Sequence, residues 1–162
     1  MSTSHTAITR SVRRPGLWSA ATATAAASLL FPKIEGIRNH GRSPWQLLYF
    51  FVPLDLEGLI LVPILIALTY GLFWLVGQPA LRATAGRNRP ARAGVVCGLL
   101  GIVAVVVFWL SLPIILGGLA ITLGLEGRRL AGAEGRGGEA SAAVIAGTCA
   151  LAVGAIMWAF IT

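Results

Sequence analysis

The chain has 162 residues, of which 56% are apolar and only 12% are charged, and its formal net charge is +7. Soluble domains carry roughly 25% charged residues, because they must cover their surface with polar groups. A chain so poor in charge is not expected to fold as a water-soluble domain. Its basic residues bracket apolar segments instead of gathering on one face, which argues against a nucleic-acid-binding protein.

The sequence predicts an all-α, polytopic integral membrane protein. We expect about four to five membrane-embedded helices, two of which form a short-armed helical hairpin. Residues 1–56 form a basic N-terminal region, and residues 57–162 form the transmembrane helical bundle. Such a protein is expected in the plasma membrane as a multi-pass protein.

Residues 17–31 are the first apolar segment, which is rich in Ala and Thr and follows three arginines. The segment is a weak membrane span, a signal anchor or the hydrophobic region of a cleavable signal peptide. The last alternative fits less well, because bulky residues follow the small residues at which cleavage would occur. We favour a span or anchor. Residues 44–53 contain an aromatic cluster suited to the headgroup level, which predicts an interfacial helix.

Residues 58–77 are all uncharged. As a helix they would measure about 30 Å, the thickness of the hydrocarbon core. They are therefore the most secure span. Pro63 lies inside it and predicts a kink, which a membrane helix tolerates when neighbouring groups satisfy the freed carbonyl.

A second uncharged block covers residues 93–125 and is too long for one ordinary crossing. Pro113 divides this block. We predict a hairpin with one full arm, residues 94–112, and one short arm, residues 114–125, that is tilted, re-entrant or set in a thinned bilayer. The alternative is one long, strongly tilted helix with a kink at Pro113.

The final uncharged segment predicts a span over residues 140–161. The connection before it, EGRRLAGAEGRGGEAS, is rich in Gly and mixed in charge, which is typical of a flexible solvated loop. With five crossings, the basic residues near Arg14, in residues 82–92 and in residues 128–136 would share one side of the membrane. Cytoplasmic loops carry an excess of Lys and Arg, so we expect this side to be cytoplasmic.

Small residues recur at helical spacing in two of the predicted spans. Gly94 and Gly98 form a GxxxG pattern, and the last span carries small residues at spacing four. In membranes such positions allow helices to approach closely. The predicted helix-packing residues are Gly94, Gly98, Ala142, Ala146, Ala150 and Gly154. They indicate helix contact without identifying the partner as the same chain or another one.

The segment GVVCGLLGIVAVVVFW, ending at Trp109, aligns with AVIAGTCALAVGAIMW, ending at Trp158. Gly98 then matches Gly147, and the separation is constant throughout. This pattern predicts an internal duplication, although apolar sequence also produces chance matches.

Residues 92–160 resemble a family of small Gly-rich membrane proteins of high-GC Gram-positive (actinobacterial) bacteria that carry a domain of unknown function. The resemblance is carried by a Gly-spaced helix (GVVCGLLGIV), a Pro-centred turn (LSLPIILGGLAITLG), the basic Gly-rich loop and an Ala/Gly closing helix (AAVIAGTCALAVG). It implies a plasma-membrane address and this architecture, and it supplies no activity and no catalytic residues.

Residues that could carry chemistry are few. His5 and His40 have no neighbours at metal-ligand spacing, so we expect no metal and no cofactor. Cys97 and Cys149 lie in predicted helices and are expected to be small buried hydrophobes; the alternative is a redox or palmitoyl role, since helices packed in register would bring them together. The sequence has no Walker, GxSxG or HExxH motif.

Asp55 and Glu57 stand two residues apart where the secure span begins. Carboxylates beside apolar surface can bind cations or protons, so these two are a candidate interfacial acidic site for a cation or for a partner arginine. The alternative is that both are hydrated and mark the start of the span.

The sequence therefore predicts a non-enzymatic accessory, assembly or structural component of the plasma membrane that acts through helix packing. Its expected partners are the lipid bilayer, anionic lipid headgroups at the Arg-rich loops, and another membrane protein or a second copy; nucleic acid is not expected. The main alternative is a small transporter or channel subunit that oligomerises, and an intramembrane enzyme ranks third. Such a pore would be lined by Thr69, Tyr70, Ser111 and Thr122.

Overall fold

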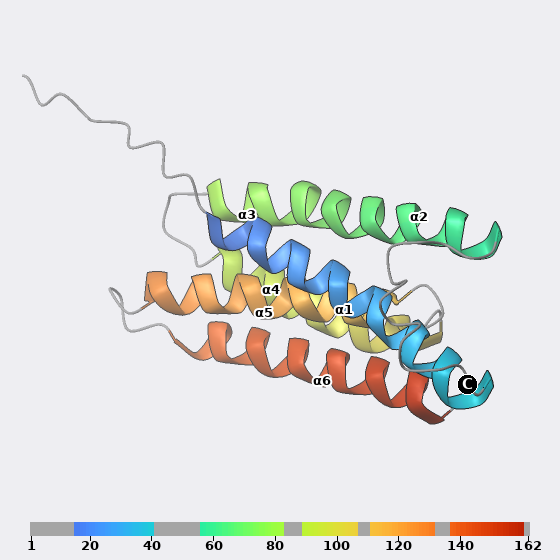
Figure 1. The fold of residues 1–162 in the computed structure, drawn as a ribbon. Coiled ribbons are helices and arrows are strands. Elements are labelled where there is room, and N and C mark those ends of the chain that lie inside the picture. Colours follow the sequence, from blue (N-terminus) through green and yellow to red (C-terminus); the bar gives the residue numbers. More distant parts are fainter. Residues whose placement is uncertain (1–14, 41–55, 83–88, 107–110, 132–136, 161–162) are drawn as a thin grey trace, which may run out of the picture.

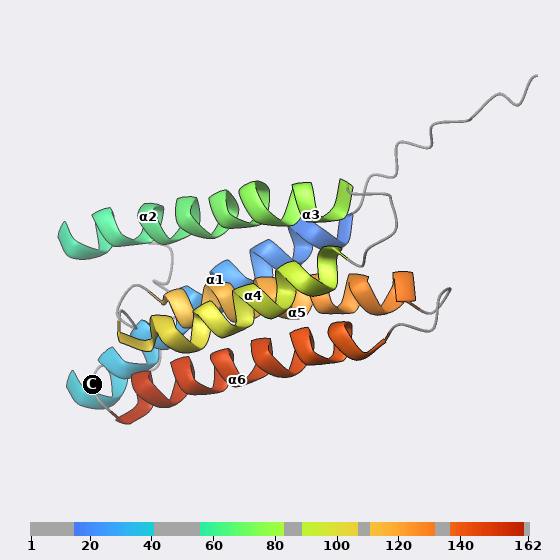
Figure 2. The same cartoon turned by 180° about the vertical axis from the view of Figure 1, so that it is seen from behind.

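The structure, a computed structural model, describes residues 15–40, 56–82, 89–106, 111–131 and 137–160. Within these ranges the regular secondary structure is all helical, so the prediction of an all-α fold is confirmed for this part of the chain. Figures 1 and 2 show long helices lying side by side. They are α1 (Pro15–His40), α2 (Leu56–Leu72), which continues through a π-helical turn η2 (Phe73–Gly77) into α3 (Gln78–Arg82), α4 (Arg89–Val103), α5 (Leu112–Ala131) and α6 (Gly138–Phe160).

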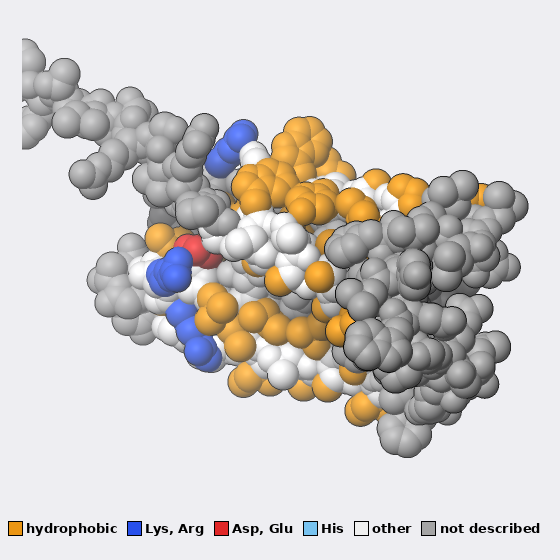
Figure 3. Space-filling model, in the orientation of Figure 1, with side chains coloured by type: hydrophobic (Ala, Val, Ile, Leu, Met, Phe, Trp, Pro, Cys, Tyr) orange, Lys and Arg blue, Asp and Glu red, His pale blue; other side chains and the backbone are white. Residues whose placement is uncertain are grey.

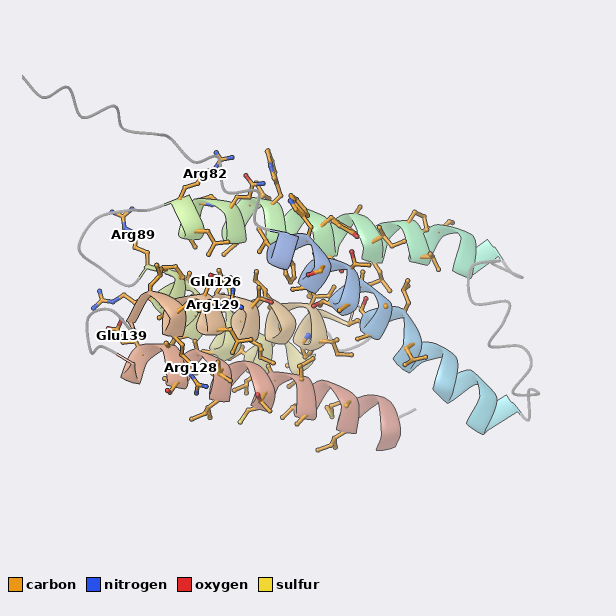
Figure 4. All side chains as sticks on the ribbon, turned by 60° about the vertical axis from the view of Figure 1, so that its left-hand side comes forward. Arg82, Arg89, Glu126, Arg128, Arg129 and Glu139 are labelled. Atoms are coloured by element: carbon orange, nitrogen blue, oxygen red, sulfur yellow. The ribbon has the colours of Figure 1, made fainter. Side chains whose placement is uncertain are left out.

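The direction of the chain alternates from one helix to the next. α1, α4 and α6 begin at the end of the bundle where α3 and α5 finish (Figures 1 and 2). The connected segment α2–η2–α3 and α5 therefore run antiparallel to the other three helices. The helix ends that carry Arg82, Arg89 and Arg129 consequently meet at the same end of the bundle (Figure 4).

Within the described residues, three helices are long and apolar enough to cross a membrane, which supports a membrane protein. They correspond to the predicted spans 58–77, 94–112 and 140–161, with shifted ends. The weaker predicted spans, residues 17–31 and 114–125, are not among the three, so the count of four to five spans stays a prediction. The three segments are Val62–Arg82, Arg89–Val106 and Gly138–Met157.

α5 is longer than the predicted short arm. Its 20 residues correspond to about 30 Å of helix, against about 18 Å for residues 114–125 alone. The helix continues through EGRRLA, which the sequence suggested to be loop, and α6 begins two residues before the predicted span. The loop prediction was therefore wrong at both ends. Arg128 and Arg129 are favourable in the last turn of a helix, because the C-terminal end of its dipole attracts cations.

α4 begins earlier and ends earlier than predicted. It starts at Arg89, with Pro90 in the first turn, and after Val103 it tightens into a 3₁₀ turn that is described as far as Val106. Proline is well tolerated in a first turn because its missing N–H would have no helical partner there. Pro113 occupies the same place in α5, so it opens that helix and does not form the centre of the turn.

Ser111 turns the chain into α5. Its φ of 52° lies in the left-handed region, which is uncommon outside glycine. Its carbonyl accepts hydrogen bonds from the N–H groups of Ile114 (3.1 Å) and Ile115 (3.0 Å). α4 and α5 then pack alongside each other, with Gly101 facing Leu116. The hairpin prediction therefore agrees with the structure, and the alternative of one long kinked helix was wrong.

The N-terminal helices also differ from expectation. α1 extends over 26 residues, well beyond the predicted segment 17–31. α2 stays helical across Pro63, and the irregularity lies instead in the π-helical turn. The predicted interfacial helix, residues 44–53, lies outside the described residues.

The core of the bundle is centred on α5, which packs against α1, α4 and α6. Its buried face is apolar and continuous with buried side chains of α1 and η2, including Leu17 and Phe73. The outer surface is also largely apolar between the charged end and the opposite end, as Figure 3 shows for one side. The fully buried apolar side chains of α5 are Pro113, Ile114, Ile115, Leu119, Ala120 and Leu123.

Candidate functional site

The predicted packing glycines of α4 lie directly against α6. A Cβ placed on Gly94 would lie 2.9 Å from the Cβ of Ala143, and one on Gly98 would lie 2.6 Å from the Cβ of Ala146. Real Cβ atoms do not approach this closely, so only glycine allows the observed distance between the two backbones. The contact that the sequence indicated is thus found within a single chain.

The contact face of α6 is rotated from the predicted one. Ala150 and Gly154 are buried and Ala146 is partly buried, whereas Ala142 lies on the exposed side of the helix. Ala143 takes part in the contact instead. A strict spacing of four drifts around a helix with 3.6 residues per turn, so a stripe of this length cannot stay on one face.

Sequence reasoning missed the glycines of α5. Gly117 and Gly124 allow α5 to approach α6 closely, as Gly94 and Gly98 allow α4 to do. A Cβ on Gly117 would lie 2.7 Å from the carbonyl oxygen of Gly147, and one on Gly124 would lie 3.0 Å from that of Ala140. The signal was present in the sequence as two glycines seven residues apart, which is two helical turns.

The two segments predicted to be copies of each other lie side by side, in the same direction and in register. Gly94 contacts Ala143 and Gly101 contacts Ala150, and both pairs are 49 residues apart in the sequence. This is also the separation between Gly98 and Gly147, which the aligned segments match. Two copies of one helix paired in parallel would give this relation; that they arose by duplication stays a prediction.

α1 packs against the unit formed by α4, α5 and α6, and its contacts with α5 involve small and polar residues. A Cβ on Gly118 would overlap the Oγ1 atom of Thr24, so the two helices approach closely there. Further along, the hydroxyl of Ser111 donates a hydrogen bond of 3.1 Å to the carbonyl of Ser28, and both serines are fully buried. These contacts tie α1 to the start of α5.

α2 is attached to α1 by an aromatic contact. The rings of Trp18 and Tyr70 stack with their centroids 6.0 Å apart. The hydroxyl groups of Tyr70 and Thr22 share a hydrogen bond of 2.8 Å. One helical turn further, Trp74 exposes 58% of its surface. Tryptophan and tyrosine are enriched at membrane–water interfaces, where an amphipathic ring meets both environments.

The charged side chains that the structure describes gather at one end of the bundle (Figures 3 and 4). Arg92 and Glu139 form an ion pair of 3.0 Å between α4 and α6, and Arg129 pairs with Glu126 within α5 at the same distance. The other arginines whose side chains are described, Arg82, Arg89 and Arg128, have no described carboxylate within ion-pairing distance. This end of the bundle therefore carries an excess of positive charge.

The two cysteines lie in different environments. Cys97 is buried in the core next to α5, whereas Cys149 is exposed on α6, and neither forms a disulfide. The expectation that both are buried was wrong for Cys149. Cys149 directly precedes Ala150, which contacts Gly101, and one residue turns a helix by about 100°, so Cys149 points away from that contact.

The candidate acidic site cannot be assembled from the described residues. Asp55 lies outside them, and only the backbone of Glu57 is described, as is also true of His40. Among the described side chains, no three His, Cys, Asp or Glu residues come together as they would around a metal ion.

Comparison with known proteins gave no relative: no family model, no curated protein and no solved structure matches the chain. The resemblance to the Gly-rich membrane family therefore stays a prediction.

Proposed function

We propose that the chain is a multi-pass protein of the plasma membrane, an accessory, assembly or structural component that works through helix packing and not through catalysis. The observation that carries the proposal is the backbone contact among α4, α5 and α6. Three glycines of α4 and two of α5 allow these helices to pack closely without large side chains between them. Close packing of this kind stabilises helices in lipid, where the hydrophobic effect does not drive them together.

The outer surface supports a lipid environment for this unit. Large apolar side chains of α2, α4 and α6 are exposed, in numbers that a water-soluble monomer rarely tolerates. Apart from Ile60, which comes two residues before the first of them, they lie on the three segments that are apolar enough to cross a membrane. The most exposed of them include Ile60, Trp74, Leu75, Val96, Val103, Val106, Ile145 and Ile156.

We propose that the chain crosses the membrane five times. The end of the bundle that carries Arg82, Arg89 and Arg129, called the arginine end below, would lie in the cytoplasm. The alternating directions of the helices support this topology, because each helix returns the chain to the opposite end. The excess of arginine at one end supports the orientation, since basic loops stay on the cytoplasmic side. α5 would cross inside the shell formed by α1, α4 and α6, which accounts for its lower exposure to lipid.

A transporter or channel subunit is the second candidate, and the hydroxyl groups expected to line its pore do not favour it. Thr69 donates to the carbonyl of Leu65 (2.7 Å), and Thr122 donates to the carbonyl of Gly118 (2.8 Å). Ser111 and Tyr70 bond to α1, as described above. Each of these hydroxyls already bonds within its own chain, and Thr69 and Ser111 are fully buried, so these two do not face a surface that could line a pore.

Mass measurement in mild detergent, after extraction from the native membrane, separates the candidates. A stoichiometric complex with a different membrane protein, retained when the chain is re-purified by a tag on that second protein, is the expected result. A homo-oligomer that carries ions across liposome membranes would favour the channel subunit. A monomer without a stable partner would contradict both.

A further inference from the structure

One outward face of α2–η2–α3 becomes steadily more polar towards the arginine end. It carries Tyr70, Trp74, Gln78 and Arg82, each four residues after the previous one. The side chains of Trp74 and Arg82 are exposed, and those of Tyr70 and Gln78 are partly exposed. An aromatic pair is therefore followed by an amide and then by a guanidinium group, in the direction that leads out of the apolar part of the bundle.

The π-helical turn brings these four residues closer to one side of the helix than a regular α-helix would. In a regular α-helix each step of four residues overshoots a full turn by about 40°, so three steps would rotate Arg82 well away from Tyr70. A π-helix holds more residues per turn, because its hydrogen bonds join residues five apart. The step from Trp74 to Gln78 runs through η2. The π-helical turn therefore removes part of the accumulated rotation.

The side chains of this face are held in place by neighbours. Trp18 stacks on Tyr70, and Thr22 bonds its hydroxyl. At the polar end, Nη2 of Arg82 donates a hydrogen bond of 2.6 Å to Oε1 of Gln78. This bond leaves the amide NH₂ of Gln78 and further guanidinium N–H groups as donors, and the described residues offer no carboxylate to Arg82. Figure 4 shows Arg82 pointing away from the other helices.

We propose that this face binds one anionic phospholipid of the leaflet at the arginine end. The proposal rests on the membrane insertion proposed above. The phosphate would bind the donors of Arg82 and Gln78, and the indole N–H of Trp74 would bond the ester region, with the acyl chain along the apolar surface below it. Trp74 and Arg82 are eight residues apart, about 12 Å along the helix, which spans the distance from the upper acyl chains into the headgroups.

The chemistry of these groups matches such a lipid better than a zwitterionic one. Guanidinium groups bind phosphate with two parallel, charge-assisted hydrogen bonds. A zwitterionic headgroup places its own cation next to the phosphate, which would repel Arg82. Phosphatidylglycerol lacks that cation, so an arginine at the headgroup level with no carboxylate partner among the described residues favours it.

Native mass spectrometry of the full chain in detergent tests the proposal, with dioleoylphosphatidylglycerol as the probe and dioleoylphosphatidylcholine as the neutral comparison. We expect one tightly held phosphatidylglycerol, bound about tenfold more strongly than phosphatidylcholine, as one charge-assisted contact would give. Arg82→Gln and Trp74→Leu should each weaken this binding by about tenfold. Arg89→Gln is the control, because it removes the same charge from the same end of the bundle but from α4.

Equal losses in Arg82→Gln and Arg89→Gln would overturn the proposal, since they would indicate attraction by net charge alone. Equal binding of the two lipids would also overturn it. Displacement of the lipid by inorganic phosphate at matched concentration would indicate a free-phosphate site instead. Unchanged thermal unfolding of the variants shows that they are folded. The proposed function has a separate test, which is insertion of the wild-type chain into lipid bilayers. Failure to insert would refute the proposed function, whereas the lipid titration in detergent tests only the lipid site.

Discussion

Gly117 and Gly147 face each other across the contact between α5 and α6. A Cβ on Gly117 would lie 2.7 Å from the carbonyl oxygen of Gly147, and a Cβ on Gly147 would lie 2.8 Å from that of Gly117. The obstacle is backbone in both directions, so no side-chain rotation can make room. The two helices are therefore locked at a distance that only glycine permits at these positions.

Replacing either glycine with alanine should destabilise the bundle. Overpacking against rigid backbone costs about 1–3 kcal/mol, and the better helix propensity of alanine returns up to about 1 kcal/mol. We therefore expect Gly117→Ala and Gly147→Ala to lower the free energy of unfolding by about 1–2 kcal/mol each, measured by denaturant titration in mixed micelles. Gly71→Ala is the matched control, because nothing lies within 4 Å of a Cβ there. A loss of stability in Gly71→Ala equal to that of the other two would contradict the account.

A glycine of α4 and the alanine that faces it on α6 can be exchanged by a double substitution. The exchange should restore stability for Gly101 and Ala150. A Cβ on Gly101 would meet the Cβ of Ala150 at 2.9 Å, and the nearest backbone atom is 3.5 Å away. Adding Ala150→Gly to Gly101→Ala should therefore recover most of the lost stability.

At Gly98 the same exchange should recover much less. Backbone atoms of Ala146 and Gly147 would lie 2.9 and 3.0 Å from the new Cβ, and they stay when Ala146→Gly removes the side chain. Double-mutant cycles on the two pairs give the two coupling energies directly. Equal recovery in both pairs would show that the helices shift apart freely, contrary to the close backbone contact.

The two cysteines should differ in their reaction with a small, uncharged, membrane-permeant thiol reagent. In detergent micelles Cys149 is expected to react first, because it is exposed, and Cys97 only when the bundle unfolds. Mass spectrometry before and after denaturation counts the modified thiols. Modification of Cys97 at the rate of Cys149 under native conditions would place α4 differently from the structure.

Labelling of single cysteines in intact cells shows which end of the bundle faces the cytoplasm. Both native cysteines are first replaced by alanine. Gly137→Cys then places a single thiol at the arginine end, directly before the start of α6. Thr162→Cys follows Phe160, the last residue of α6, by two positions in the sequence. With a membrane-impermeant maleimide, the first should be labelled only after lysis and the second before it. The reverse pattern would refute a cytoplasmic arginine end.

The sequence predicted the presence of the helices better than their ends. Charged residues were read as the limits of helices, but they mark only where the chain leaves the hydrocarbon region. α5 passes beyond Glu126 to Ala131, and α4 begins at Arg89, because arginine is a good helix former and needs only water around its charge. Helix ends therefore follow capping and proline position, which composition alone does not reveal.

The sequence predicted some of the small-residue contacts between helices and missed others. Gly94 and Gly98 stood out because their spacing matches a known contact pattern. Gly117 and Gly124 did not, since their importance depends on which helices surround α5. The π-helical turn had no sequence signal, because it is a local insertion in the hydrogen-bond ladder that a regular periodicity cannot express.

Extraction of native membranes at alkaline pH, followed by chromatography with and without detergent, tests the central claim that lipid is the solvent of this bundle. Alkaline carbonate releases proteins held by charge and leaves those held in the hydrocarbon layer. The account predicts that the chain stays in the membrane pellet, elutes as one sharp species only when detergent is present, and aggregates without it. A chain released by carbonate that stays monodisperse in plain buffer would contradict it.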